Sequence, residues 1–512
     1  MKTEATSKKQ VGLNMTANIV SYSANILISF VLTPFLINTI GKETYSFYPI
    51  ANTIVSYMSI LTNAMNSVAS RFVTVSLVQG DEKKASQYFS STMLSNIIIS
   101  AIIAIPLTII VIFIDKILNV PINAIAAVRA LFSLVFASAI VNIIASVLGI
   151  ATFAKNRIDL RSFRELITAI VRVALFFALY KILPPSIVYV GIVALVVAFI
   201  NILFQYGYTK VLIPEIKIRR KFISVNKTKE LISSSAWNAI NSFGNVLLAG
   251  MSLVLANIFY GAAASGTYSI VNTVPTFING IISMLVGVFF PVITYKYAQK
   301  DREGLLNEIK TSQALVGSFG CATIATFIVL SQEFFNLWTP GENSQELFLL
   351  SFITILPHLV IASTWTLTNV AIVTNKVKTP ALITLYCGLL NILLSFLAYK
   401  LFYAGLISLP IISSGIQLFW IGIFIPIYIA KCLKVNNHYF LGGIWGGAEL
   451  SIVLIILELF IKRAVFKSIN SWIKLGGLGI VLEIINLIIL CFALIGPSKL
   501  KNVISEFARR NK

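Results

Sequence analysis

The chain has 512 residues, of which 57% are hydrophobic and only 12% are charged, and it carries a formal net charge of +21. A soluble globular protein has about 25% charged residues, so this composition excludes a water-soluble domain and indicates a protein embedded in a lipid bilayer. The charge-free runs are long and continuous, unlike the alternating segments of about 10 residues in a membrane β-barrel. The sequence therefore predicts an all-α integral membrane protein.

Apolar stretches long enough to cross the hydrocarbon core recur along the whole chain, since a spanning helix needs roughly 20 such residues. An even number of spans would place both termini on the same side of the membrane. We predict about 14 transmembrane helices, near residues 12–38, 47–70, 86–114, 121–150, 160–183, 186–209, 231–259, 265–294, 309–332, 347–373, 379–401, 408–430, 440–461 and 475–496.

Basic residues gather in alternate loops of this arrangement, above all between residues 213 and 230. The positive-inside rule places such loops in the cytoplasm, and the N- and C-termini are then cytoplasmic too. Attraction of these loops to anionic membrane lipids accounts for the net charge, so no nucleic-acid partner is expected. One outer loop is an exception to the rule, because it carries Lys462, Arg463, Lys467 and Lys474.

Short segments of the first half recur in the second half at a nearly constant spacing of about 220 residues. Each half holds six predicted helices, an even number, so the two copies are parallel and related by an axis along the membrane normal. The matched segments are QGDEKK (79–84) and QKDREG (299–304), KNR (155–157) and TNK (374–376), LYK (179–181) and AYK (398–400), and TYS at both 44–46 and 267–269.

The repeat predicts two parallel six-helix lobes followed by two more helices. Two such lobes enclose a cleft, and rocking one lobe against the other opens the cleft to alternate sides of the membrane. This architecture is typical of a transporter. The predicted domains are an N-terminal lobe (1–212), a basic cytoplasmic linker (213–230), a C-terminal lobe (231–435), and two extra transmembrane helices with a basic cytoplasmic tail (436–512).

The segments IGKETYSFYPIANTI (40–54), NSVASRF (66–72) and GDEKKASQYFSS (80–91) resemble bacterial oligosaccharide flippases. These form the polysaccharide-biosynthesis branch of the superfamily that also contains MATE multidrug exporters and lipid II flippases. The resemblance implies a MATE-like fold in the plasma membrane. It also implies a cargo, an undecaprenyl-pyrophosphate-linked oligosaccharide repeat unit turned from the inner to the outer leaflet. Membrane lipids and polysaccharide polymerase machinery are the other expected partners, and the chain is expected to act as a monomer.

Polar side chains within the predicted helices are costly in lipid and are therefore functional candidates. The leading helices of each half are the most polar, and amides there can bind sugar hydroxyls in the cleft. The alternative is that the same amides pack helices against one another. The candidate asparagines are Asn14, Asn18 and Asn25, which share one helix face, together with Asn63, Asn66, Asn238, Asn241 and Asn245.

Three arginines of the first half are candidates for binding the pyrophosphate, because a guanidinium group matches phosphate geometry. Arg129 and Arg172 lie inside predicted helices, and Arg71 ends the second helix at its cytoplasmic side. Each also has a structural alternative. Arg71 would anchor its helix at the interface, Arg129 would reach the outer surface, and Arg172 would pair with a buried carboxylate.

Acidic residues of the predicted helices concentrate in the last two. Glu449 and Glu483 lie at mid-depth, and Glu458 has Lys462 one turn further on, so a local ion pair is expected there. The four cysteines and two histidines are scattered, so neither a metal site, a cofactor nor a catalytic residue is predicted. Coupling of transport to a proton or sodium gradient stays open.

Three other functions compete with this interpretation. A MATE-type exporter of cationic molecules would place acidic residues in the lobe cavities, and the first twelve predicted helices have almost none. A membrane enzyme would need a catalytic group of residues in a large outer loop, and the predicted outer loops are short. A lipid II flippase differs only in its cargo and stays an alternative.

Overall fold

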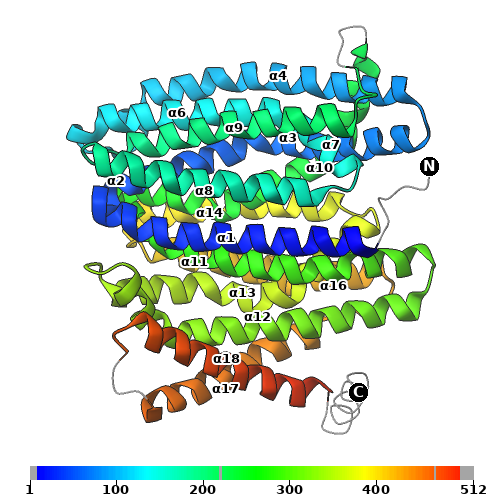
Figure 1. Ribbon diagram of the computed structural model, residues 1–512. Helices are drawn as coiled ribbons and strands as arrows, with labels where there is room; N and C mark the ends of the chain where they lie inside the picture. Colours follow the sequence, from blue (N-terminus) through cyan, green and yellow to red (C-terminus); the bar gives the residue numbers. More distant parts are fainter. Residues whose placement is uncertain (1–7, 218–221, 466–468, 496–512) are drawn as a thin grey trace. The chain divides into compact units, whose positions relative to one another are not determined.

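The computed structural model describes residues 8–217, 222–465 and 469–495. Every regular element in these ranges is helical (Figure 1), so the predicted all-α membrane fold is confirmed. Part of the predicted basic linker and the predicted basic tail lie outside the described residues, as does Lys467. The chain divides into two compact units, residues 1–269 and 270–512, and each is described by itself.

Unit 1 consists of long helices joined by short helical connections. Within it α3 packs against α4, α6 and α10, while α1 packs against α8. A buried cluster that includes Met65, Phe89 and Leu231 joins α3, α4 and α10. The elements are α1 (Lys8–Ile40), α2 (Lys42–Tyr45), α3 (Phe47–Val78), α4 (Glu82–Ile112), α5 (Ile114–Ile117), η2 (Ile122–Ala124), α6 (Ile125–Ala145), η3 (Ser146–Gly149), α7 (Ile150–Ala154), α8 (Ile158–Ile182), α9 (Val188–Leu212), α10 (Val225–Ala249) and the first part of α11 (Met251–Ala298).

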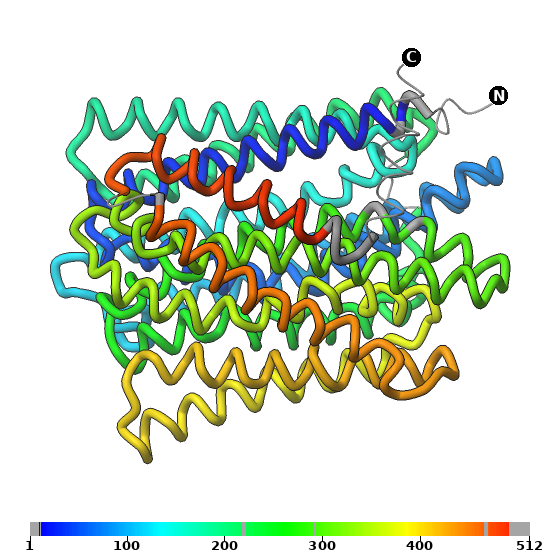
Figure 2. The backbone as a smooth tube through the Cα atoms, turned by 90° about the horizontal axis from the view of Figure 1, so that it is seen from below, coloured from blue at the N-terminus to red at the C-terminus, as the bar shows by residue number. Residues whose placement is uncertain are grey.

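Unit 2 begins within α11 and is organised around α12, which packs against α13, α17 and α18. The last two helices, orange and red in Figure 2, run beside α12. The buried residues Leu330, Leu478 and Leu482 belong to the apolar cluster that joins α12 to α18. The elements are α12 (Arg302–Trp338), α13 (Ser344–Val373), α14 (Lys378–Phe402), α15 (Ser408–Phe419), the π-helical η5 (Trp420–Phe424), α16 (Ile425–Cys432), α17 (Leu441–Val465) and α18 (Trp472–Ile495).

The compact units do not follow the predicted lobe boundaries. Unit 1 extends past the predicted end of the first lobe at residue 212, because α10 packs against α3 and α4. Helices that pack together need not belong to the same repeat, so a compact unit and a predicted lobe can end at different residues. The lobes at 1–212 and 231–435 therefore stay predictions.

The internal repeat is visible in the backbone at the helix ends. Gly80 and its counterpart Lys300 both adopt left-handed conformations, with φ of 77° and 58°. The residues that follow, Asp81 and Asp301, begin the next helices in the same way. Each carboxylate accepts a hydrogen bond from the backbone amide three residues on, at 2.8 Å and 2.9 Å. Both turns therefore end one helix with a left-handed residue and begin the next with an aspartate cap.

Two further pairs of positions repeat the left-handed conformation. Asn156 and Asn375 have φ of 51° and 56°, and asparagine tolerates this region better than most residues. Gly41 and Gly261 have φ of 81° and 89° where the helical path is interrupted. Since the same local conformations recur in both halves, the backbone supports the duplication predicted from the sequence.

The two TYS triplets, by contrast, are not structurally equivalent. Ser46 lies at the junction of α2 and α3, whereas Ser269 lies further inside its helix when both are counted from the left-handed glycines Gly41 and Gly261. Ser46 instead accepts a hydrogen bond from Ser265, at 2.9 Å between the two hydroxyl oxygens. The triplets are offset from the register of the other repeats, so their match is accidental.

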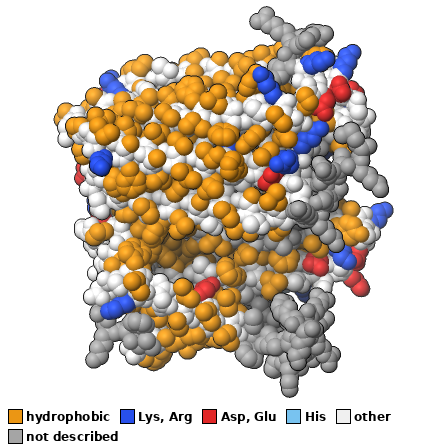
Figure 3. All heavy atoms as spheres, viewed as in Figure 1, with side chains coloured by type: hydrophobic (Ala, Val, Ile, Leu, Met, Phe, Trp, Pro, Cys, Tyr) orange, Lys and Arg blue, Asp and Glu red, His pale blue; other side chains and the backbone are white. Residues whose placement is uncertain are grey.

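Eleven described segments are long and apolar enough to span a membrane. One of them, Val225–Gly287, contains α10 and much of α11, with the break at Gly261. Neither α3, which is rich in polar residues, nor the charged α8 is among the eleven, and the number of 14 stays a prediction. On the face shown in Figure 3, hydrophobic side chains cover the middles of the helices and charged ones gather towards the ends, as a membrane protein requires.

Candidate functional site

All of the predicted site residues lie in unit 1, on α1, α3, α6, α8 and α10. The structure separates them into two groups. Asn14, Asn66 and Arg129 hold neighbouring elements together, whereas the others lie wholly or partly exposed on their helices.

Asn14 fixes the start of α8 against α1. Its amide nitrogen donates to the side-chain oxygen of Asn156 at 3.0 Å, and its amide oxygen accepts from the backbone amide of Asp159 at 3.0 Å. Two turns further on, Ser21 donates to Glu165 at 3.4 Å. The buried members of the predicted α1 stripe therefore face α8, which is the packing alternative for these residues.

Asn66 belongs to a buried network between α3, α4 and η3. Its amide nitrogen donates to the hydroxyl of Ser146 at 2.6 Å, and its amide oxygen accepts from Asn96 at 3.2 Å. Asn96 is fully buried and also donates to the carbonyl of Ile143 at 3.0 Å. Asn66 is therefore used for packing in this structure.

A polar stripe runs along the exposed side of α3, next to the contact with α10. Asn63 and Arg71 were predicted there, and the structure adds three exposed residues on the same side: Asn52, Ser56 and Ser67. Asn52, Ser56, Asn63 and Ser67 are spaced as i, i+4, i+11 and i+15, which places them on one helix face. This spacing can be read from the sequence alone. Arg71 lies near the C-terminal end of α3, with its guanidinium 5.5 Å from the centre of the Phe72 ring.

The neighbouring α10 carries a second polar stripe. It runs antiparallel to α3, because Tyr57 donates to the carbonyl of Val246 at 3.1 Å and Gly250 lies beside Thr53. With this contact fixed, helical geometry turns both stripes towards the same side of the helix pair. We call their residues the polar face of unit 1: Asn52, Ser56, Asn63, Ser67 and Arg71 of α3, with Asn238, Asn241 and Asn245 of α10.

The two remaining asparagines of α1 take no part in this face. Asn25 is half-buried and donates to the carbonyl of Ser21 in its own helix at 2.9 Å. Asn18 is exposed between the contacts that Asn14 and Ser21 make with α8. The stripe predicted on α1 is therefore split between packing and exposure.

Arg172 lies halfway along α8 and is half-buried. Along the parallel α1 and α8 it falls between two contacts, the Ser21–Glu165 hydrogen bond and the Phe35–Phe177 ring pair, whose centres are 5.5 Å apart. Among the described residues, no ion pair includes Arg172. The pair with a buried carboxylate that was considered for Arg172 is therefore not formed among the described residues, and the guanidinium lies at mid-helix without an ion-pair partner there.

Arg129 is tied to the end of unit 1 rather than to its middle. Its guanidinium lies 2.7 Å from the Asp115 carboxylate and also donates to the carbonyl of Ile112 at 3.1 Å. The hydrogen bond from Arg129 lowers the pKa of Asp115. This arrangement agrees with the structural alternative for Arg129, in which the side chain reaches the surface instead of binding pyrophosphate.

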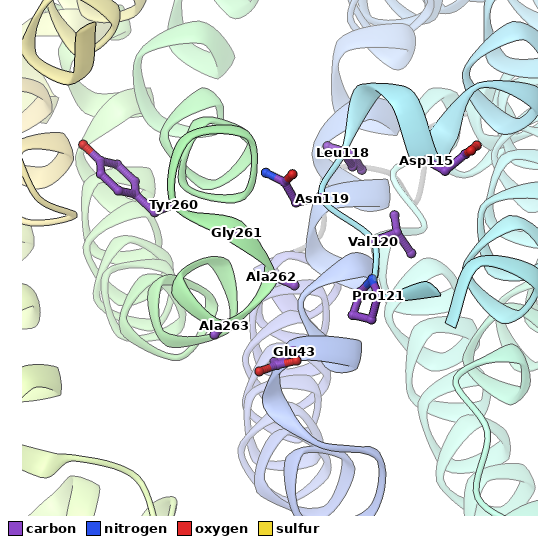
Figure 4. Close-up of a pocket in the computed structure, with 10 residues that line it drawn as sticks. All are labelled: Glu43, Asp115, Leu118, Asn119, Val120, Pro121, Tyr260, Gly261, Ala262 and Ala263. Carbon is purple, nitrogen blue, oxygen red and sulfur yellow. The ribbon is translucent and has the colours of Figure 1, made fainter. Parts of the chain in front are cut away.

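The same end of unit 1 carries an open pocket of about 430 Å³ (Figure 4). Asn119 fixes its wall against α11 with three hydrogen bonds. Its backbone amide donates to the Asn257 side-chain oxygen at 2.8 Å, and its side-chain amide donates to the carbonyls of Asn257 at 2.7 Å and Ile258 at 3.0 Å. The charged lining groups of the pocket, Glu43 and Asp115, are both acidic. None of the predicted site residues lines this pocket, so it lies apart from the candidate site.

The polysaccharide biosynthesis protein family matches residues 11–295, which is more than half of the chain. The chain belongs to this family. It is also 27% identical to the uncharacterized membrane protein EpsK of Bacillus subtilis (strain 168) over 476 residues, covering 91% of this chain and 92% of that protein. The resemblance to polysaccharide flippases drawn from the sequence is therefore confirmed.

Solved structures show the same fold at low sequence identity. An inward-facing MATE family multidrug resistance transporter superposes with a TM-score of 0.67 at 11% identity, covering 81% of this chain and 96% of its own. Lipid II flippase MurJ in an inward closed conformation gives a TM-score of 0.64 at 14% identity, covering 94% of this chain and 99% of its own. The predicted MATE-like fold is confirmed.

Proposed function

We propose that this protein translocates an undecaprenyl-pyrophosphate-linked oligosaccharide repeat unit from the inner to the outer leaflet of the bacterial plasma membrane by alternating access, with both termini in the cytoplasm. The observation that carries the proposal is Arg172, a half-buried guanidinium at mid-helix without an ion-pair partner among the described residues. Such a group is too costly in lipid to be kept for packing alone.

The remaining groups of unit 1 suit the two chemical parts of this cargo. Amides and hydroxyls on the polar face offer donors and acceptors to sugar hydroxyls. Arg71, at one end of that face, and Arg172 at mid-depth provide guanidinium groups that hold phosphate through paired hydrogen bonds. MurJ is a flippase of lipid II by its name, so the fold is compatible with a lipid-linked glycan.

The membrane potential favours outward movement of an anion. Each negative charge that crosses the field gains about 2.3 kcal/mol per 100 mV. A pyrophosphate diester with two charges therefore gains up to about 4–5 kcal/mol on crossing the full potential drop. We propose transport without a bound cofactor, by a monomer that delivers its cargo to a polysaccharide polymerase.

The test compares a strain that lacks this protein with one that carries it. Lipid-linked repeat units are extracted from spheroplasts that were treated with an impermeant glycosidase. We expect the enzyme to digest the units when the protein is present and to leave them intact when it is missing. Digestion without the protein would refute the function. Trapped lipid II, or no trapped lipid at all, would point instead to the lipid II flippase or the MATE-type exporter.

The role of Arg172 is tested in the same assay with a matched variant. Arg172→Ala should trap the repeat units as the deletion does, at an unchanged amount of protein in the membrane. Arg161→Ala is the control, because Arg161 lies on the same helix with 64% of its side chain exposed and in an i,i+4 pair with Glu165. Repeating the assay after collapse of the proton or the sodium gradient shows which of them, if either, transport needs.

A further inference from the structure

Two acidic side chains of the last two helices meet against α12 in unit 2. Glu458 of α17 is fully buried, and Glu483 of α18 is half-buried. Three polar neighbours complete the group: Thr323 and Thr326 of α12, and the fully buried Asn486 of α18. We call these five residues the acid pair cluster. None of them belongs to unit 1, where the predicted substrate-binding residues lie.

Both carboxylates contact the same hydroxyl group. The hydroxyl oxygen of Thr326 lies 2.7 Å from Oε1 of Glu458 and 3.4 Å from Oε2 of Glu483. Thr323 lies 3.1 Å from the other oxygen of Glu483, and the Asn486 amide nitrogen lies 2.5 Å from Oε1 of Glu458. A hydroxyl carries one hydrogen, so Thr326 can donate to only one of the two acids at a time.

The cluster contains no positive charge. The ion pair that the sequence predicted between Glu458 and Lys462 is wrong, because Lys462 lies 2.7 Å from Glu333 of α12 and donates to the carbonyl of Val329 at 2.7 Å. Among the described residues no other cation pairs with Glu458 or Glu483. The pair with Glu333 also neutralises one of the basic residues in the outer loop that breaks the positive-inside pattern.

Two buried atoms of the cluster have no hydrogen-bond partner. They are Oε2 of Glu458 and Oδ1 of Asn486, both acceptors on side chains that are fully buried. Nearly all buried polar atoms in proteins are hydrogen-bonded. Two acceptors without a donor, beside two carboxyl groups that no described cation pairs with, favour a proton on one of the carboxyl groups.

We propose that Glu458 and Glu483 bind one proton between them, so that α17 and α18 are joined to α12 by a shared-proton site. Two carboxylates that share a site cannot both be ionised in a medium of low dielectric constant, and one proton removes half of the charge. That proton also converts an acceptor without a donor into a donor. This proton-binding site does not depend on which molecule the protein transports.

The contacts favour a proton over a metal ion. Each carboxylate already accepts a hydrogen bond from a threonine hydroxyl or an asparagine amide, so these hydrogens point to the oxygens that a cation would have to contact. Within the described residues, no three His, Cys, Asp or Glu side chains lie together as a metal site would require. The other titratable side chains on the helices around the cluster bond elsewhere or lie away from it: Lys310, Cys321 and Glu333 of α12, His358 of α13, Glu449, Lys462 and Arg463 of α17, and Lys474 of α18.

Infrared spectroscopy of the full-length protein in lipid tests the proposal directly, because a protonated carboxyl has its own carbonyl band. We expect this band at neutral pH in the unaltered protein. Glu458→Gln and Glu483→Gln should each shift the band, because the proton then stays on one acid, and the double variant should remove it. Glu449→Gln should leave it, because Glu449 is an exposed acid on the same helix. A missing band in the unaltered protein, or a band that survives both substitutions, would overturn the proposal.

Thermal unfolding across a range of pH provides a second readout. A proton bound more tightly in the folded state stabilises at low pH, and that stability is lost as the pH rises. The melting temperature of the unaltered protein should therefore fall with rising pH, and the double variant Glu458→Gln/Glu483→Gln should flatten the dependence. A flat profile in the unaltered protein would contradict the shared proton. So would a melting temperature that rises with added sodium at fixed pH in the unaltered protein but not in Glu458→Gln.

Discussion

The network around Asn66 offers a direct test of packing against binding. Asn66→Ala removes the donor to Ser146 at 2.6 Å and the acceptor for Asn96 at 3.2 Å. Polar contacts between membrane helices contribute about 0.6 kcal/mol each on average and up to about 1.7 kcal/mol. Loss of two such bonds, with Asn96 left partly unsatisfied in a buried position, predicts a loss of about 1–3 kcal/mol in the free energy of unfolding.

A double-mutant cycle in a lipid-like environment measures this effect. Asn96→Ala and the double variant Asn66→Ala/Asn96→Ala are unfolded under the same conditions as Asn66→Ala. Because both side chains belong to one network, the double variant should lose less stability than the sum of the single losses. Additive losses would refute the coupling of Asn66 to Asn96. An Asn66→Ala protein of full stability that no longer transports would show that Asn66 binds cargo rather than holding helices together.

Two further predictions concern the turns that recur in both halves of the chain. Gly261→Ala should destabilise the protein by about 1–3 kcal/mol, because φ of 89° with ψ of 179° is a conformation for glycine alone. The control Gly287→Ala, in an open helical position, should stabilise the protein by about 0.5–1 kcal/mol. Equal effects of the two substitutions in an unfolding titration would refute the strain argument. Asp301→Ala should lower the melting temperature near neutral pH by removing the cap of α12 and the pair with Lys296. Since the Lys296 hydrogen bond lowers the pKa of Asp301, the stabilising effect is present above the ordinary carboxyl pKa and is lost as the pH falls through the lowered value, where the variant and the unaltered protein should converge.

Local properties of this protein could be predicted from the sequence because they depend on neighbouring residues alone. Long charge-free runs identify membrane helices, and the aspartates of GDEKK and KDREG occur where a helix cap is needed. The same reasoning failed for the two TYS triplets, because they lie at different distances from the repeated glycines Gly41 and Gly261. The number of spans also stayed unsettled, because α3 and α8, predicted as spans at 47–70 and 160–183, are not among the eleven segments that are long and apolar enough to cross a membrane.

The sequence by itself determined that the chain is helical, lies in a membrane and belongs to its family, and it predicted the duplication. Only the tertiary structure decided which polar side chains are covered. Asn63 and Asn66 are three residues apart on α3, yet one is exposed and the other is enclosed by α4 and η3. Lys462 likewise pairs with Glu333, 129 positions away in the sequence, and not with Glu458 one turn away. Helical periodicity fixes the direction in which a side chain points, but the neighbour it meets there depends on how separate helices pack.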